Sequence, residues 1–98
     1  MPLDLHIKYD DELFYFDISE SLHSSIFSNS TGWRSFKYLR KIKDYYRADL
    51  LFKDNDAVSF LKELVYVCEK NGLASIKINE IKVILKENKI IYLRVSSD

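Results

Sequence analysis

The fold is decided at the start of the chain, by the stretch LDLHIKYDDELFYFDI at residues 3–18. Its first half alternates apolar and polar side chains from Leu3 to Tyr9, which is the period of a half-buried β-strand. Its second half is aromatic and β-prone, with three apolar side chains on one face: Phe14, Phe16 and Ile18. Three acidic residues separate the halves: Asp10, Asp11 and Glu12. The stretch therefore predicts a β-hairpin with an acidic tip.

Two helices and a loop are predicted after the hairpin. Ser19 suits the N-cap of a short helix, and the polar residues 28–32 (SNSTG) form the clearest loop. Residues 33–47 place apolar side chains on one side at helical spacing and basic side chains on the other, which predicts an amphipathic helix with a basic outer face. The apolar run 48–52 (ADLLF) is either a buried strand or the end of that helix, and its length favours a strand.

The second half of the chain predicts one long helix and a second hairpin. Residues 54–70 begin with acidic capping groups and repeat apolar residues at spacings of three and four, and Gly72 suits the left-handed position after a helix. Residues 76–85 alternate in two phases, with a turn or bulge at Asn79 and Glu80, and this pattern predicts strands. Residues 86–89 then form a turn before a last strand at 90–95.

The fold class that follows is α+β. We expect an antiparallel sheet built from N- and C-terminal hairpins, with two to three helices packed on one face. Since the chain has 98 residues, residues 1–98 form a single domain. The one cysteine, Cys68, allows no internal disulfide, which fits the reducing cytoplasm. No apolar run approaches the roughly 20 residues of a membrane span, and residues 1–4 do not resemble a signal peptide.

Charge is sorted along the chain although the formal net charge is zero. Residues 1–20 contain six acidic residues and one basic residue, Lys8. Residues 33–47 contain six basic residues and one acidic residue, Asp44. Two opposed patches of this kind indicate electrostatic steering of a charged partner.

Catalytic or cofactor chemistry is not indicated. His6 falls on the polar face of the first strand and His23 on a short helix, and a solvated role is favoured for both. Cys68 lies on an apolar helical stripe, which favours a buried, inert thiol. Neither metal-ligand spacing nor a phosphate-binding glycine loop is present, so we expect no enzyme activity, no cofactor and no metal.

The acidic hairpin is the first candidate binding surface. Its ordinary interpretation is a solvated turn, but acidic residues beside tyrosines also imitate a nucleic-acid backbone and offer anchors for a basic cleft. The residues proposed to bind a partner are Tyr9, Asp10, Asp11, Glu12, Tyr15 and Asp17.

The basic helix is the alternative binding surface. Its ordinary interpretation is a solubilising outer face, either free in solvent or paired with the hairpin in the same molecule. A pI near 6.7 argues against a dedicated nucleic-acid binder. Trp33 at its start fits a lid on the core or, if exposed, an interface anchor. The residues that would contact phosphates or stack on bases are Arg34, Lys37, Tyr38, Arg40, Lys41, Tyr45 and Arg47.

With its acidic hairpin, its many aromatic residues and its lack of catalytic groups, the chain resembles the small immunity proteins that bacteria encode beside contact-dependent growth-inhibition toxins. The resemblance covers the whole chain in size and class and includes no motif, so no residue role is carried over. It implies a non-catalytic cytoplasmic protein that binds and blocks one cognate toxin, a nuclease in the first instance, in a 1:1 complex. The alternatives are a nucleic-acid-binding regulator and a small adaptor with an exposed apolar patch.

Overall fold

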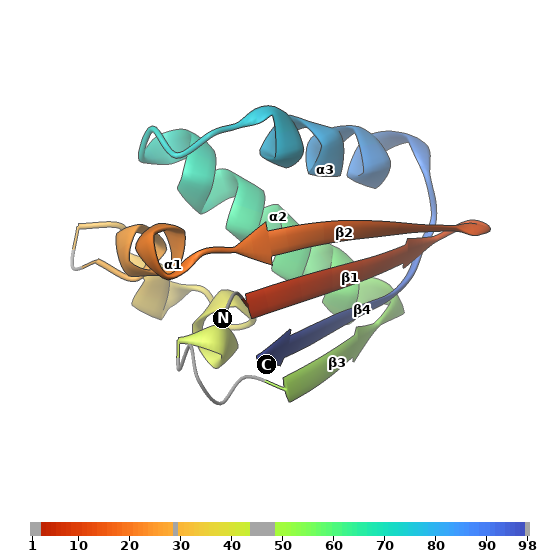
Figure 1. Cartoon of the computed structure of the whole chain (residues 1–98), viewed down its shortest axis with the longest axis horizontal. Coiled ribbons are helices and arrows are strands. Elements are labelled where there is room, and N and C mark those ends of the chain that lie inside the picture. The colour runs from red at the N-terminus through yellow and green to blue at the C-terminus, as the bar shows by residue number, and fades with distance from the viewer. Residues whose placement is uncertain (1–2, 29, 44–48, 98) are drawn as a thin grey trace.

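The computed structural model describes residues 3–28, 30–43 and 49–97 (Figure 1), so Tyr45 and Arg47 of the basic surface lie outside the described residues. The elements in chain order are β1 (Leu3–Tyr9), β2 (Glu12–Ile18), α1 (Glu20–Ile26), the 3₁₀-helices η1 (Trp33–Ser35) and η2 (Leu39–Ile42), β3 (Asp49–Lys53), α2 (Asp54–Lys70), α3 (Ile76–Glu87) and β4 (Ile90–Ser97). An antiparallel sheet with helices confirms the α+β class.

The sheet has the strand order β2-β1-β4-β3, with every neighbouring pair antiparallel. The N-terminal hairpin is confirmed, and its register places Leu5 opposite Phe16. The predicted strand after residue 48 is also confirmed, as β3. β4 is the last strand in the chain but lies between β1 and β3 in the sheet. The sheet therefore brings together the N-terminal hairpin, β3 from the middle of the chain, and the C-terminal strand.

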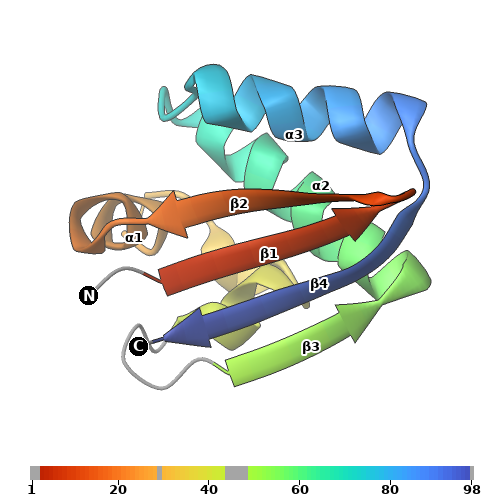
Figure 2. The ribbon, with the colours of Figure 1, turned by 45° about the vertical axis from the view of Figure 1, so that its right-hand side comes forward.

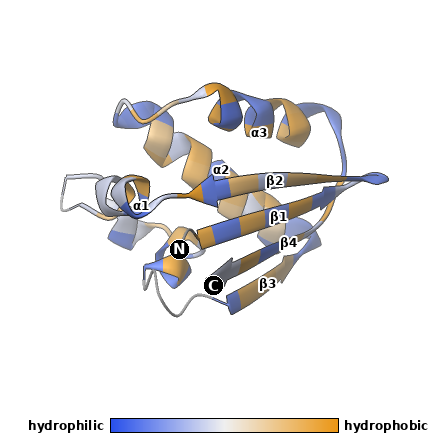
Figure 3. Cartoon of the chain, in the orientation of Figure 1, coloured by the Kyte–Doolittle hydropathy of each residue, from blue (hydrophilic) through white to orange (hydrophobic). Residues whose placement is uncertain are grey.

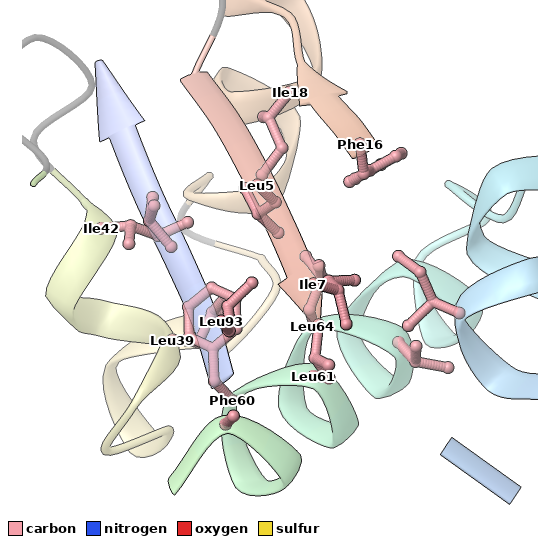
Figure 4. Packing of buried hydrophobic residues seen from close by; sticks show 14 of the residues in the cluster. Leu5, Ile7, Phe16, Ile18, Leu39, Ile42, Phe60, Leu61, Leu64 and Leu93 are labelled. Atoms are coloured by element: carbon pink, nitrogen blue, oxygen red, sulfur yellow. The ribbon is translucent and has the colours of Figure 1, made fainter. Parts of the chain in front are cut away.

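One face of the sheet carries the core. Leu5, Ile7 and Leu93 point from the strands towards α2, whose Phe60, Leu61 and Leu64 meet them (Figure 4). The strands alternate hydrophobic and hydrophilic residues (Figure 3), as expected for a sheet with one buried face. No described helix lies in front of the other face (Figure 2), which we call the open face.

Helix α2 confirms the long helix predicted at residues 54–70, and local signals for its start and end are present. Asp54 and Asp56 lie in its first turn, although the N-cap residue, Lys53, makes no side-chain capping bond. Gly72 has φ 70, the left-handed conformation that ends helices readily at glycine. The amide of Leu73 then donates to the carbonyl of Cys68 at 2.7 Å, which closes the last turn.

The predicted C-terminal hairpin is wrong, because residues 76–87 form helix α3. Ser75 caps this helix by accepting a hydrogen bond from the amide of Ile78 at 3.3 Å. The buried residues Ile78, Ile81 and Ile84 follow one another at a spacing of three, so they line one face of a helix. The predicted turn at 86–89 is therefore the end of α3 and the connection to β4.

The predicted helix over 33–47 is also wrong in its described part, which forms η1 and η2. The chain is extended at Phe36, with φ −100 and ψ 107, and this breaks any continuous helix. Oε1 of Glu63 then accepts hydrogen bonds from the amides of Tyr38 and Leu39, at 3.0 and 2.8 Å. A carboxylate on α2 thus takes the place of helical backbone partners, while Leu39 and Ile42 are buried as the pattern predicted.

Candidate functional site

The acidic tip of the hairpin, residues Asp10, Asp11 and Glu12, lies at one end of the long axis of the molecule (Figure 1). All three side chains are exposed. Asp10 has φ 48, a left-handed conformation that aspartate tolerates better than most residues. Its amide donates to the carbonyl of Lys89 at 3.2 Å, which ties the turn to the chain just before β4. The carboxylates are therefore presented on an anchored turn.

An apolar groove lies beside this tip, with a volume of about 430 Å³. Tyr9 and Phe14 contribute to it from the hairpin, on the helix side of the sheet. Helix α3 contributes the opposite wall, where the side chains of Ile76 and Val83 are 79% and 51% exposed. The other lining residues are Asn79, Glu80, Ile84 and Asn88. Exposed aliphatic and aromatic groups in one hollow offer anchoring positions to a partner.

Acidic side chains lie close to Tyr9, which belongs to the groove. The hydroxyl of Tyr9 donates to Oε2 of Glu12 at 3.2 Å. The pKa of Tyr9 is raised, first by the loss of water around it, then by this hydrogen bond and by the charges of Glu12, Glu80 and Asp10. The Nζ of Lys77 lies 5.1 Å from the ring centre of Phe14, so a cation also lies beside the groove.

The structure separates the six predicted hairpin residues into two sets. Tyr9, Asp10, Asp11 and Glu12 gather around the tip and groove, whereas Tyr15 and Asp17 lie on the open face, since they are paired with His6 and Asp4 of β1. Tyr15 is 56% exposed and packs edge-on against His6, with ring centres 4.8 Å apart.

The basic segment lies towards the other end of the long axis from the tip (Figure 1). Its described members, Arg34, Lys37, Arg40 and Lys41, are exposed. The ion pairs described by the structure join Glu69 to Lys82 and Asp49 to Arg94, and neither links the two patches. The hairpin tip and the described basic segment lie towards opposite ends of the molecule (Figure 1).

Two described aromatic residues of the basic segment, Tyr38 and Trp33, are engaged within the protein. The hydroxyl of Tyr38 donates to Oδ1 of Asp56 at 3.0 Å, and the ammonium groups of Lys37 and Lys41 lie 5.5 and 5.6 Å from its ring centre. Trp33 is buried as a lid on the core, and the guanidinium carbon of Arg34 lies 4.5 Å from its ring centre. Neither ring is freely presented for base stacking.

The histidines and the cysteine have structural surroundings. His23 is buried rather than solvated, and its Nε2 donates to the carbonyl of Ile42 at 2.7 Å. His6 is half-buried on the open face against Tyr15. Cys68 is buried, and this burial, followed by the nearby charge of Glu69, raises the pKa of the thiol to about 11.

Two searches of the described residues bear on metals and membranes. Over residues 3–28, 30–43 and 49–97, no group of three or more His, Cys, Asp or Glu side chains is placed to hold a metal ion. In the same part of the chain, no helix combines the length and the apolar character needed to cross a membrane.

Comparison of the chain with protein-family models, with curated proteins and with solved structures gave no match. What the protein binds therefore has to be inferred from its own surface.

The sequence pattern did not indicate the wall of the groove that α3 forms. Ile76 and Val83 were assigned to strands, so their position on an exposed helical wall was not expected. A signal was present in Ser75, a good N-cap residue, followed by isoleucines at a spacing of three.

Proposed function

We propose that this protein is a non-catalytic inhibitor of the immunity type, which binds a cognate toxin domain and covers its active site or substrate surface. The class of toxin that we propose is a nuclease. The acidic tip and the apolar groove together form the docking surface. The observation that carries the proposal is their adjacency, since Tyr9 lines the groove and its hydroxyl donates to the carboxylate of Glu12 at the tip.

The two parts of this surface contribute differently to binding. Carboxylates that are exposed and far from the basic segment attract a basic surface over a distance of about 10 Å at 0.1 M salt, and so raise the association rate. Apolar side chains buried on contact slow dissociation, because most of the binding energy of an interface resides in a few buried anchors. A nuclease cleft that binds phosphates offers the basic surface that such a tip requires.

The other parts of the proposal are a 1:1 complex and a cytoplasmic location. The buried free thiol of Cys68 supports a reducing compartment. The tip protrudes from one end of the molecule (Figure 1), which favours insertion of one tip into one cleft.

The proposal predicts that a toxin domain is encoded beside this chain, and the test is a stopped-flow measurement of binding to that domain. The triple variant Asp10→Lys, Asp11→Lys, Glu12→Lys should slow association at least tenfold at low salt, and the difference should shrink as salt is added. Asp11→Lys is compared with the matched control Glu20→Lys, which makes the same change of charge on α1, away from the tip. Equal effects of Asp11→Lys and Glu20→Lys would contradict docking through the tip.

The groove is tested by Ile76→Ser, which removes an apolar side chain from its wall and leaves the charge unchanged. We expect faster dissociation with little change in association, because the substitution acts on the formed contact. Tyr66→Ser, at a 52% exposed site on α2, is the control. Nucleic-acid binding through the basic segment stays a prediction: a band shift with RNA or DNA that Arg34→Ala and Arg40→Ala abolish would favour it over inhibition.

A further inference from the structure

We propose that the open face of the sheet binds a second copy of this chain, in an antiparallel face-to-face dimer. The inference does not depend on the proposed function, because it uses a surface other than the tip and groove. It rests on how the strand register arranges charges on this face.

Register places the outward side chains in three rows across the four strands. The acidic row, at the end of the sheet away from the hairpin tip, is Asp17, Asp4, Ser96 and Asp49. The middle row is Tyr15, His6, Arg94 and Leu51. The basic row, nearest the tip, is Leu13, Lys8, Tyr92 and Lys53. Three carboxylates therefore occupy one end of the face, where Asp49 also pairs with Arg94 of the middle row at 3.4 Å. Two ammonium groups occupy the other end, where Asp54 lines the hollow beside Lys53.

Apolar groups occupy the centre and the basic end of the same face. Tyr15, Leu51 and Leu13 are 56%, 53% and 39% exposed. Tyr92 and Leu51 also line a shallow hollow of about 400 Å³ over β3 and β4. A second face laid on this one would cover these groups and place a side chain in the hollow.

The charged rows of the open face favour a second copy of the chain as the partner, and they determine how that copy is oriented. A two-fold axis in the plane of the sheet and perpendicular to the strands lays the acidic row of one copy over the basic row of the other. Asp49 then meets Lys53 of the second copy, and the same contact occurs a second time by symmetry. A two-fold axis parallel to the strands would instead lay acidic row on acidic row, which is repulsive. The two end rows are thus complementary to each other in this orientation, and Arg94 of the middle row, which faces Arg94 of the second copy, is offset by its own pair with Asp49.

The size of the interface predicts a dimer of low affinity. Four strands spaced by about 4.8 Å give a footprint roughly 20 Å across. Such an area is near the lower limit for specific interfaces, so the dimer should depend on protein concentration and on salt. The acidic tips point in opposite directions in this arrangement and stay outside the interface.

The experiment uses two charge reversals on β3, Asp49→Lys and Lys53→Glu. Molar mass is measured by light scattering after gel filtration, over a range of protein concentrations at low salt, with circular dichroism as the folding control. The wild type should approach the mass of a dimer as concentration rises, and each variant alone should stay monomeric, because each brings like charges together. A mixture of the two variants should dimerise, since Asp49 of one then faces Lys53 of the other and Glu faces Lys at the reciprocal contact.

Several outcomes would overturn the proposal. They are a wild type that is monomeric up to millimolar concentration, a dimer that persists in either single variant, and a mixture that stays monomeric although both variants fold. Lys86→Glu on α3 is the control, because it changes charge away from the open face and should leave the dimer intact. Asp49→Lys and Lys53→Glu leave the tip and groove unchanged, so toxin binding reports on the proposed function separately.

Discussion

His23 on α1 and Ile42 on η2 are joined by a 2.7 Å hydrogen bond from the imidazole Nε2 to the backbone carbonyl. Both residues are buried. The bond fixes the segment after the hairpin to the 3₁₀-helices that carry the basic side chains. A histidine expected in solvent is thus an internal connection between two elements far apart in sequence.

Replacing His23 with leucine should lower the free energy of unfolding by about 1–3 kcal/mol, because the carbonyl of Ile42 would be buried without a donor. Urea denaturation monitored by tryptophan fluorescence measures the change. His6→Leu on the open face is the matched control, and we expect less than about 0.5 kcal/mol there. Equal losses in the two variants would show that the His23 bond contributes little.

Glu63→Ala should loosen the basic segment, because Oε1 of Glu63 accepts from the amides of Tyr38 and Leu39. We expect faster hydrogen exchange at these two amides and a loss of roughly 1–3 kcal/mol in stability. Glu69→Ala, which removes an exposed pair with Lys82, should cost less than about 1 kcal/mol. Unchanged exchange at Tyr38 and Leu39 in Glu63→Ala would contradict this assignment.

Asp54→Gly should stabilise the protein by about 0.5–1 kcal/mol. β3 passes into α2 without a loop, and Asp54 makes this reversal at φ 48, where glycine has no steric cost. Asn55→Gly, one residue later in the first turn of α2, should instead destabilise by a similar amount, because glycine is a poor helix former. Opposite signs at adjacent positions, measured as urea midpoints, test the backbone conformation directly.

Val83→Ala distinguishes helix from strand at residues 76–87. Val83 is 51% exposed on α3, and alanine is the better helix former, so stability should rise by up to about 0.5 kcal/mol. In a strand the same substitution would lower stability, because valine is the better strand former. The urea midpoint gives the sign.

Cys68 should make stability depend on pH in alkaline solution. Its thiol has a pKa of about 11 in the folded protein against a reference value of 9.0, so the folded state retains its proton more firmly than the unfolded state. The resulting stabilisation is fully present below pH 9 and is lost as the pH rises towards 11. The difference in unfolding free energy between the wild type and Cys68→Ala should therefore shrink over this range.

If the difference in unfolding free energy between the wild type and Cys68→Ala stays constant from pH 9 to about 11, the pKa of Cys68 is not raised in the folded protein. Alkylation by iodoacetamide supplies a second readout, since a buried protonated thiol should react far more slowly in the folded protein than in urea.

The sequence correctly predicted the elements in which the spacing of apolar side chains and the residues at the ends of the element indicate the same secondary structure. The N-terminal hairpin has a clean alternation and an acidic turn, and α2 has acidic residues at its start and Gly72 just beyond its end. The site was predicted in part, because exposed carboxylates at a turn follow from local sequence alone. Their neighbours on α3 depend on how distant elements pack.

The secondary structure predicted for two segments was wrong, and the physical reason is clear in each case. In residues 76–85 the β-branched isoleucines and valine favour strands by intrinsic preference, but burial of one face against α2 selects the helix. In residues 33–43 the apolar spacing is helical, but Glu63, twenty-five positions after Tyr38, captures the amides that a helix would use. Neither partner is visible in a local window of sequence.

The position of β4 has a consequence for how this chain reaches its native state. The β1–β2 hairpin and β3 share no ladder, and only β4 pairs with both, placing Leu3 opposite Ser97. A nascent chain that lacks these eight residues exposes the inward edges of β1 and β3 and much of the apolar sheet surface. Completion of the sheet is therefore a late, long-range event, and loss of the final strand should yield an aggregating product rather than a smaller folded one.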